Sequence, residues 1–181
     1  NGVRAVHGGQ QGGIGNQIEY ITISTLGDAK DFGDLTGGNT EQPAAVADLS
    51  DRGIFAGGSR SASASNIIDF VTISSTSNAT DFGDLTQARY GLGGVSNGTR
   101  GVFAGGAGNK DTIDYITIAS AGNATDFGNV QSWETGHTSV SDGTNGYHGA
   151  GNGTNSYENE IQKTVIATLG NAALFKSEEA N

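Results

Sequence analysis

Hydrophobic and polar positions alternate along this chain in short runs. In the segment IDYITIA, residues 113–119, apolar side chains alternate with the polar Asp114 and Thr117. Such alternation is typical of a β-strand that has one buried face and one partly wet face. Comparable runs elsewhere are rich in Val, Ile, Thr, Tyr and Phe and are bounded by Gly, Asn, Asp and Ser. The pattern therefore predicts an all-β protein built from short strands.

The same pattern returns four times. In each copy an Ile precedes a Phe by 14 residues: Ile18 and Phe32, Ile68 and Phe82, Ile113 and Phe127, Ile161 and Phe175. The interval from the leading Arg or Asn to that Ile changes instead, being 14, 16, 13 and 16 residues. We expect the constant half to be rigid, with the four Phe side chains buried at equivalent positions, and the other half to contain a variable loop. Repeats of this length are typical of propeller blades and related arrays.

Turn residues divide each copy into four expected antiparallel strands. Gly57-Gly58 and Gly105-Gly106 end the second strand, where close backbone packing and positive φ angles are expected. A phosphate-binding loop is a weaker interpretation of these pairs, because no helix pattern follows them. Asn97-Gly98 and Asp142-Gly143 lie between the first and second strands, and each predicts a tight hairpin with two consecutive positive φ angles.

The repeat predicts the boundaries of four units and shows that the first unit is incomplete. The predicted units are residues 1–36, 37–86, 87–130 and 131–175, followed by a polar tail at 176–181. Residues 1–4 align with 97–100, the turn into a second strand, so the first unit lacks its inner strand. Because an exposed sheet edge is seldom left uncovered, we expect a longer parent chain or a neighbouring subunit to supply that strand.

The third unit contains Arg89, Gly105-Gly106, Tyr115 and Phe127, and the second unit has equivalents at Gly57-Gly58, Phe70 and Phe82. In these residues the unit resembles a kelch repeat. The resemblance implies a kelch-like β-propeller with four-stranded blades, formed by these four repeats of 45–50 residues alone or as part of a larger propeller. Phe stands where that family usually has an outer-strand Trp.

The repeat also contains the segments RGVFAGG, IDYITIA and NATDFGDLT. In these segments its sequence resembles arrays in tail-fibre and structural proteins of marine bacteriophages. This second resemblance implies a virion or extracellular location and a receptor-binding or host-attachment role.

Composition excludes some partners. The 181 residues carry a formal charge of −10, which argues against nucleic acid because phosphate binding depends on Lys and Arg. The chain has no Cys for disulfides or thiolate metal sites, and no apolar run long enough to insert into a membrane.

Recurring acids and histidines admit a chemical and a structural interpretation. The recurring acids are Asp31, Asp81 and Asp126 beside the Phe, Asp34 and Asp84 three residues later, and Glu19, Asp69 and Asp114 in the third strand. They could bind calcium, but we favour structural bonds with strand-end backbone or with Arg4, Arg52 and Arg100. His7 and His148 share the repeat position of Phe55 and Phe103, which favours inner-layer packing over a ligand pair. We therefore expect no metal and no cofactor.

No nucleophile–base pair departs from the repeat, so the chain is predicted not to be an enzyme. The favoured hypothesis is a structural or adhesion module whose variable loops, such as Ser59 to Asn66 and Asn152 to Asn159, meet a cell-surface glycan or protein. Other virion chains or further copies of the chain are the expected partners. The candidate contact residues are Arg60, Asn66, Asn109, Lys110, Asn155 and Tyr157. A kelch-like carbohydrate-active enzyme and a purely architectural fibre array remain the alternatives.

Overall fold

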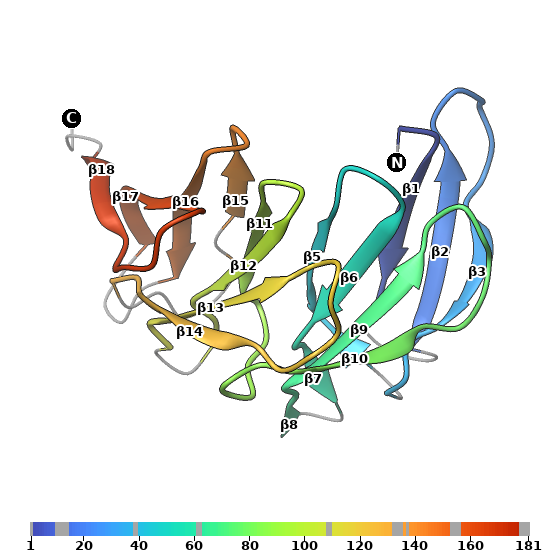
Figure 1. Ribbon diagram of the computed structural model, residues 1–181, viewed down its shortest axis with the longest axis horizontal. Coiled ribbons are helices and arrows are strands. Elements are labelled where there is room, and N and C mark those ends of the chain that lie inside the picture. The colour runs from blue at the N-terminus through green and yellow to red at the C-terminus, as the bar shows by residue number, and fades with distance from the viewer. Residues whose placement is uncertain are drawn as a thin grey trace.

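The computed structural model describes residues 2–9, 15–37, 40–60, 63–107, 110–131, 136, 138–152 and 157–177. Their strands form four successive antiparallel sheets and one small accessory sheet, and these residues contain no helix (Figure 1). The prediction of an all-β fold made of antiparallel units is confirmed. The first and last sheets stand at opposite sides of the molecule in Figure 1, and the sheets do not close on one another.

Each large sheet has its strands in chain order. The first contains β1 (Arg4–Gly8), β2 (Gln17–Thr22) and β3 (Lys30–Asp34). The second contains β5 (Ala44–Ala47), β6 (Arg52–Ala56), β9 (Ile67–Thr72) and β10 (Thr80–Asp84). The third contains β11 (Gly93–Ser96), β12 (Arg100–Ala104), β13 (Thr112–Thr117) and β14 (Thr125–Asn129). The fourth contains β15 (Thr138–Ser141), β16 (Asn145–Asn152), β17 (Tyr157–Val165) and β18 (Ala173–Ser177), so it extends into the segment predicted as a polar tail.

The accessory sheet extends one loop of the second unit. It contains β4 (Thr40–Glu41), β7 (Ser59–Arg60) and β8 (Ser63–Ala64). The β7–β8 pair projects at the lower edge of Figure 1, whereas the short turns between β5 and β6 and between β11 and β12 lie at the upper edge. The segment from Ser59 to Asn66, which the sequence predicts to be a loop, is therefore partly a hairpin.

The apolar core lies between sheets and not within any one of them. Each of three clusters joins two successive sheets. The first and second sheets share Ile18, Phe32, Leu35, Phe55, Val71 and Ile73. The second and third share a cluster that includes Ile54, Ile68, Phe82, Phe103, Ile116 and Ile118. The third and fourth share Val95, Val102, Ala104, Ile113, Phe127, Val130 and Ile166. One sheet cannot bury its own apolar face, so stability comes from stacking.

The repeated Phe shows how burial depends on the neighbouring sheet. Phe32, Phe82 and Phe127 are 2%, 3% and 4% exposed, as predicted. Phe175 is 56% exposed, so the prediction of four buried positions is wrong for the fourth copy. The reason is that each buried Phe is covered by the next sheet along the chain, and the described residues contain no sheet beyond the fourth.

A polar clasp accompanies each apolar junction. In each sheet after the first, an Asn lies in the turn before the outer strand. Its side chain accepts a hydrogen bond from the outer strand of the preceding sheet, and the amide of the Ala that follows it donates one to the same strand. The Asn pairs are Asp34 N–Asn78 Oδ1 at 3.1 Å, Asp84 N–Asn123 Oδ1 at 3.1 Å and Asn129 N–Asn171 Oδ1 at 3.0 Å. The glycines under these turns are Gly33, Gly83 and Gly128, where an added Cβ would lie 2.4–2.5 Å from a backbone oxygen of the next sheet.

The recurring Arg residues also join sheets. Arg52 Nη1 donates to the carbonyl of Ile118 at 2.9 Å, and its guanidinium lies 4.6 Å from the ring centroid of Phe70. Arg4 and Arg100 make the same two contacts, with Ile73 and Tyr20 and with Ile166 and Tyr115. The predicted pairing of these three Arg residues with the recurring acids is therefore wrong, because the guanidinium reaches across to the next sheet instead. Asp81 and Asp126 accept hydrogen bonds from nearby strand backbone, at Gly83 and Gly128, as the structural interpretation expects.

Glycine geometry agrees with the sequence in part. Gly57, Gly58, Gly105 and Gly106 all have positive φ, as expected for the ends of β6 and β12. At Asn97-Gly98 only the glycine has positive φ, at 85°. The expected two-residue turn is replaced by a longer one, in which Asn97 Oδ1 accepts hydrogen bonds from the amides of Thr99 and Arg100 at 3.0 and 2.8 Å. The Asn97 side chain thus stabilises the turn without a second residue of positive φ.

Candidate functional site

A buried ion pair is the most polar feature of the interior. Arg89 and Asp114 side chains are both 0% exposed, and Arg89 Nη2 lies 2.7 Å from Asp114 Oδ2. Arg89 Nη1 also donates to the carbonyls of Gly105, at 3.1 Å, and Thr112. Asp114 accepts from the amide and the hydroxyl of Thr86, at 3.1 and 2.6 Å. The pair ties the connection that follows β10 to the second and third strands of the third sheet.

This pair is structural. Burial lowers the pKa of the Arg89 guanidinium, while the Asp114 carboxylate acts in the opposite direction. Neither side chain reaches the surface, so a substrate could not touch them. The sequence pattern placed Asp114 on a partly wet face, which is wrong because Arg89 supplies a charged partner that permits its burial.

The other sheets fill the same position differently. In the second sheet Asp69 accepts from the amide and hydroxyl of Thr36, at 3.0 and 2.6 Å. In the fourth sheet Gln162 accepts from the amide of Gln131 at 3.0 Å. In all three sheets, therefore, a side chain of the third strand accepts a hydrogen bond from a backbone amide just after the outer strand of the preceding sheet.

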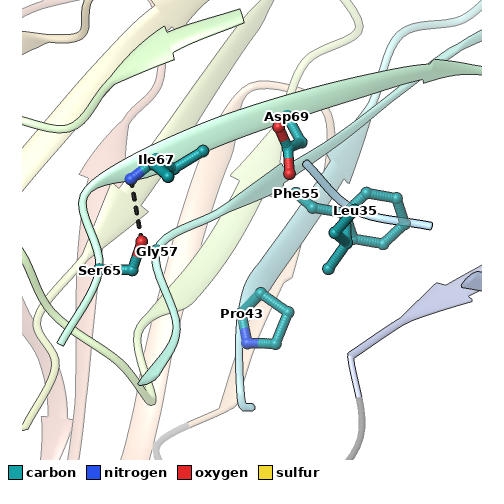
Figure 2. A pocket seen from close by; sticks show the side chains of 7 residues that line it. All are labelled: Leu35, Pro43, Phe55, Gly57, Ser65, Ile67 and Asp69. Carbon is teal, nitrogen blue, oxygen red and sulfur yellow. Dashed lines mark hydrogen bonds between the residues drawn. The ribbon is translucent and has the colours of Figure 1, made fainter. Parts of the chain in front are cut away.

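A small cavity adjoins Asp69 (Figure 2). Its lining residues are Leu35, Pro43, Phe55, Gly57, Ser65, Ile67 and Asp69, and its volume is about 10 Å³. That volume is about the space of one water molecule. The cavity is therefore too small for an organic ligand.

Of the predicted contact residues that the structure describes, Arg60 and Tyr157 lie on strands of different sheets, and Asn66 and Lys110 lie in connections before β9 and β13. Arg60 belongs to β7, which pairs with β4 and β8, and Tyr157 belongs to β17 opposite Asn152. Asn66 is half-buried and its carbonyl accepts from the amide of Leu85 at 2.7 Å. Lys110 is half-buried and its amide donates to Gly106 at 3.4 Å. Asn109 and Asn155 lie outside the described residues.

A hollow that the sequence did not indicate lies between β1 and β5. One part, of about 470 Å³, is lined by residues that include His7, Glu41, Pro43 and Phe55. An adjoining part of about 300 Å³ is lined by residues that include Ala5, Val46, Gly53 and Ile73. Both parts share Val6, Ala45 and Phe55. The sequence signal that could have found this groove is the absence of an inner strand in the first unit.

The two aligned histidines have different environments. His148 is 0% exposed, and its ring nitrogens lie 2.9 Å from Ser139 Oγ and 3.2 Å from Thr164 Oγ1. This confirms the predicted packing role for His148. His7 is exposed, so the same prediction is wrong there, because the described residues place no sheet against that face of the first sheet.

The described residues contain no group of three or more His, Asp or Glu side chains placed to hold a metal ion. No helix in the described ranges is long and apolar enough to cross a membrane. A scan against protein-family models finds no match, and a search of curated proteins finds no similar sequence.

Proposed function

We propose that this chain is a non-enzymatic adhesion or structural module of a virion or cell surface, which presents loops of one end of its sheets to a glycan or protein receptor. In this proposal the sheets are kelch-like propeller blades, and the rigid stack holds the loops in place. Other virion chains or further copies of the chain would supply several binding sites at once.

The observation that supports the proposal is the contrast between junctions and loops. The Asn clasp recurs at all three junctions with hydrogen bonds of 3.0–3.1 Å. The connection between the second and third strands varies instead: in the second unit it contains the β7–β8 hairpin, and in the third unit its described residues, 105–107 and 110–111, contain no strand. Antiparallel order places these connections together at the end opposite the turns between first and second strands. Variable segments on a constant scaffold are typical of binding surfaces.

A loop exchange tests this proposal. Residues 59–66 are replaced by residues 107–111, whose last residue, Asp111, accepts from Val130 as Asn66 does from Leu85, at 2.7 Å in both cases. The readout is binding to a glycan array and to whole cells. We expect binding to fall while the melting temperature stays close to that of the wild type.

The matched control changes the opposite end. Asn97→Asp alters charge there but keeps the turn geometry that Asp142 already adopts. Cell binding that both variants leave unchanged would remove the adhesion proposal in favour of an architectural array. Turnover of a sugar substrate would replace it by a carbohydrate-active enzyme.

A further inference from the structure

We propose that the outer edge of β1 binds an extended strand brought by a partner polypeptide. In the second, third and fourth sheets the corresponding edge is covered by β5, β11 and β15, whose sequences are AAVA, GGVS and TSVS. Each has Val at its third position and small residues elsewhere. Among the described residues β1 pairs with β2 alone. This inference does not depend on the proposed receptor binding.

The backbone of β1 is set for such pairing. Val3 accepts from the amide of Ile23 at 2.9 Å, and the amide of Gly9 donates to Gln17 at 3.1 Å. Hydrogen bonding alternates along an antiparallel pair, so the backbone groups of Val6 point away from β2. Val6 is the counterpart of Ile54 and Val102, which face Val46 of β5 and Val95 of β11. An incoming strand in the same register therefore places its Val opposite Val6.

The groove also has a seat for that Val side chain. Gly101 lies so close to the preceding sheet that an added Cβ would be 2.9 Å from Val46 Cγ2, and at Gly146 it would be 2.7 Å from Val95 Cγ2. Gly53 occupies the same repeat position in the second sheet and lines the 300 Å³ hollow. The three atoms nearest to an added Cβ at Gly53 belong to Val71 and Ile73 of its own sheet, at 3.3–3.6 Å. The space next to Gly53 thus corresponds to the spaces that Val46 and Val95 fill next to Gly101 and Gly146.

We assign the incoming strand to a partner chain. The three inner strands of the described chain already pair with β6, β12 and β16, so none is available without unfolding its own sheet. Addition of a strand to an exposed edge provides backbone hydrogen bonds for affinity and side-chain seats for specificity. The expected ligand is therefore a short extended segment with Val flanked by Gly, Ala or Ser.

The test uses the whole chain and a synthetic peptide with the sequence of residues 90–99, YGLGGVSNGT, which contains β11. NMR titration and amide hydrogen exchange report on Val6. We expect saturable binding that slows exchange of the Val6 amide, and much weaker binding of the same peptide with Val95→Asp.

Three protein variants locate the binding. Gly53→Ala should weaken peptide binding about tenfold by filling the seat. Gly149→Ala, whose added Cβ meets Ile161 at a similar 3.2 Å but lies on β16, should leave binding unchanged. Val6→Pro removes the outward amide while the neighbouring residues keep their bonds to β2, and should weaken binding about three- to tenfold, as loss of one hydrogen bond predicts.

The proposal is overturned by absence of peptide binding to the wild-type chain, or by binding that Gly53→Ala and Val6→Pro both leave unchanged. It is also overturned if the Val6 amide is already protected in the protein alone, with sedimentation showing a dimer, because a second copy would then cover the edge. Wild-type exchange at Val6 remains decisive even if a variant fails to fold.

Discussion

The first and fourth sheets stand at the two ends of the stack and differ in what they retain of the repeat. The first sheet keeps Ile21 and Ile23, which are 44% and 57% exposed, although their counterparts in the second and third sheets are buried. The fourth sheet instead loses residues that serve a following neighbour. Asn145 replaces the recurring Arg, and Lys176 occupies the register position of Gly33, Gly83 and Gly128.

This difference shows that a side chain is buried in this fold only where a neighbouring sheet packs against it. A residue with a Cβ could not replace these glycines without a clash, since an added Cβ at Gly128 would lie 2.5 Å from Gly170 O. The outer face of the fourth sheet is thus unsuited to the clasp, whereas the first sheet presents an apolar face and a strand edge. The two ends are chemically distinct surfaces, and the following experiments measure how distinct they are from the interior.

The largest expected difference is between two copies of the same Phe. Phe82→Ala should lower the free energy of unfolding by about 3–5 kcal/mol, because it opens a cavity at the second junction. Phe175→Ala should cost less than about 1 kcal/mol, since that side chain already contacts solvent. Denaturant titration of both variants measures this. Equal losses would show that Phe175 is buried in solution and would contradict the end-specific exposure.

A second comparison concerns charge inside the third sheet. Asp114→Asn should cost about 3 kcal/mol, because it leaves Arg89 buried without its counter-charge. Asp126→Asn is the matched control, since Asp126 is exposed and accepts only from the amide of Gly128. Thermal unfolding of both variants should separate them clearly. A negligible effect at Asp114 would mean that Arg89 finds another partner.

Sequence pattern predicted the strands, the constant 14-residue half and the Gly pairs because those depend on local alternation and backbone conformation. It could not predict that Phe175 and His7 would be exposed, since their environment is set by a different sheet. The sequence pattern also could not identify Arg89 as the partner of Asp114, because β11, β12 and the connection after β12 lie between the two residues. The clasp residues Asn78 and Asn123 were visible in the repeat, but a turn residue and a residue that bonds to another sheet have the same local signature.

The clasp gives a smaller prediction. Asn123→Ala should reduce the free energy of unfolding by about 1 kcal/mol, the typical net value of one hydrogen bond, because the amide of Asp84 loses its acceptor. Asp28→Ala, at the equivalent turn of the first sheet, should have no measurable effect, since Asp28 is exposed at the end of the stack. Chemical denaturation compares the two. A loss at Asp28 equal to that at Asn123 would indicate a neighbour on that face.

The smallest expected effect is a difference in how two equivalent turns, at Asp142 and at Asn97, respond to acid pH. Asp142 Oδ1 accepts from the amides of Thr144 and Asn145, at 2.8 and 2.7 Å, as Asn97 does from Thr99 and Arg100. The side-chain and backbone hydrogen bonds from Asn145, with that from Thr144, lower the pKa of Asp142 well below its ordinary value. A lowered folded-state pKa means that the stabilisation is complete above the ordinary Asp pKa of about 4 and is lost as the pH falls toward the lowered value. Amide chemical shifts in the Asp142 turn should therefore change in strong acid, while those in the Asn97 turn stay constant. Asp142→Asn should make the fourth-sheet turn as insensitive to pH as the third, and a turn that still titrates in this variant would place the titrating group elsewhere.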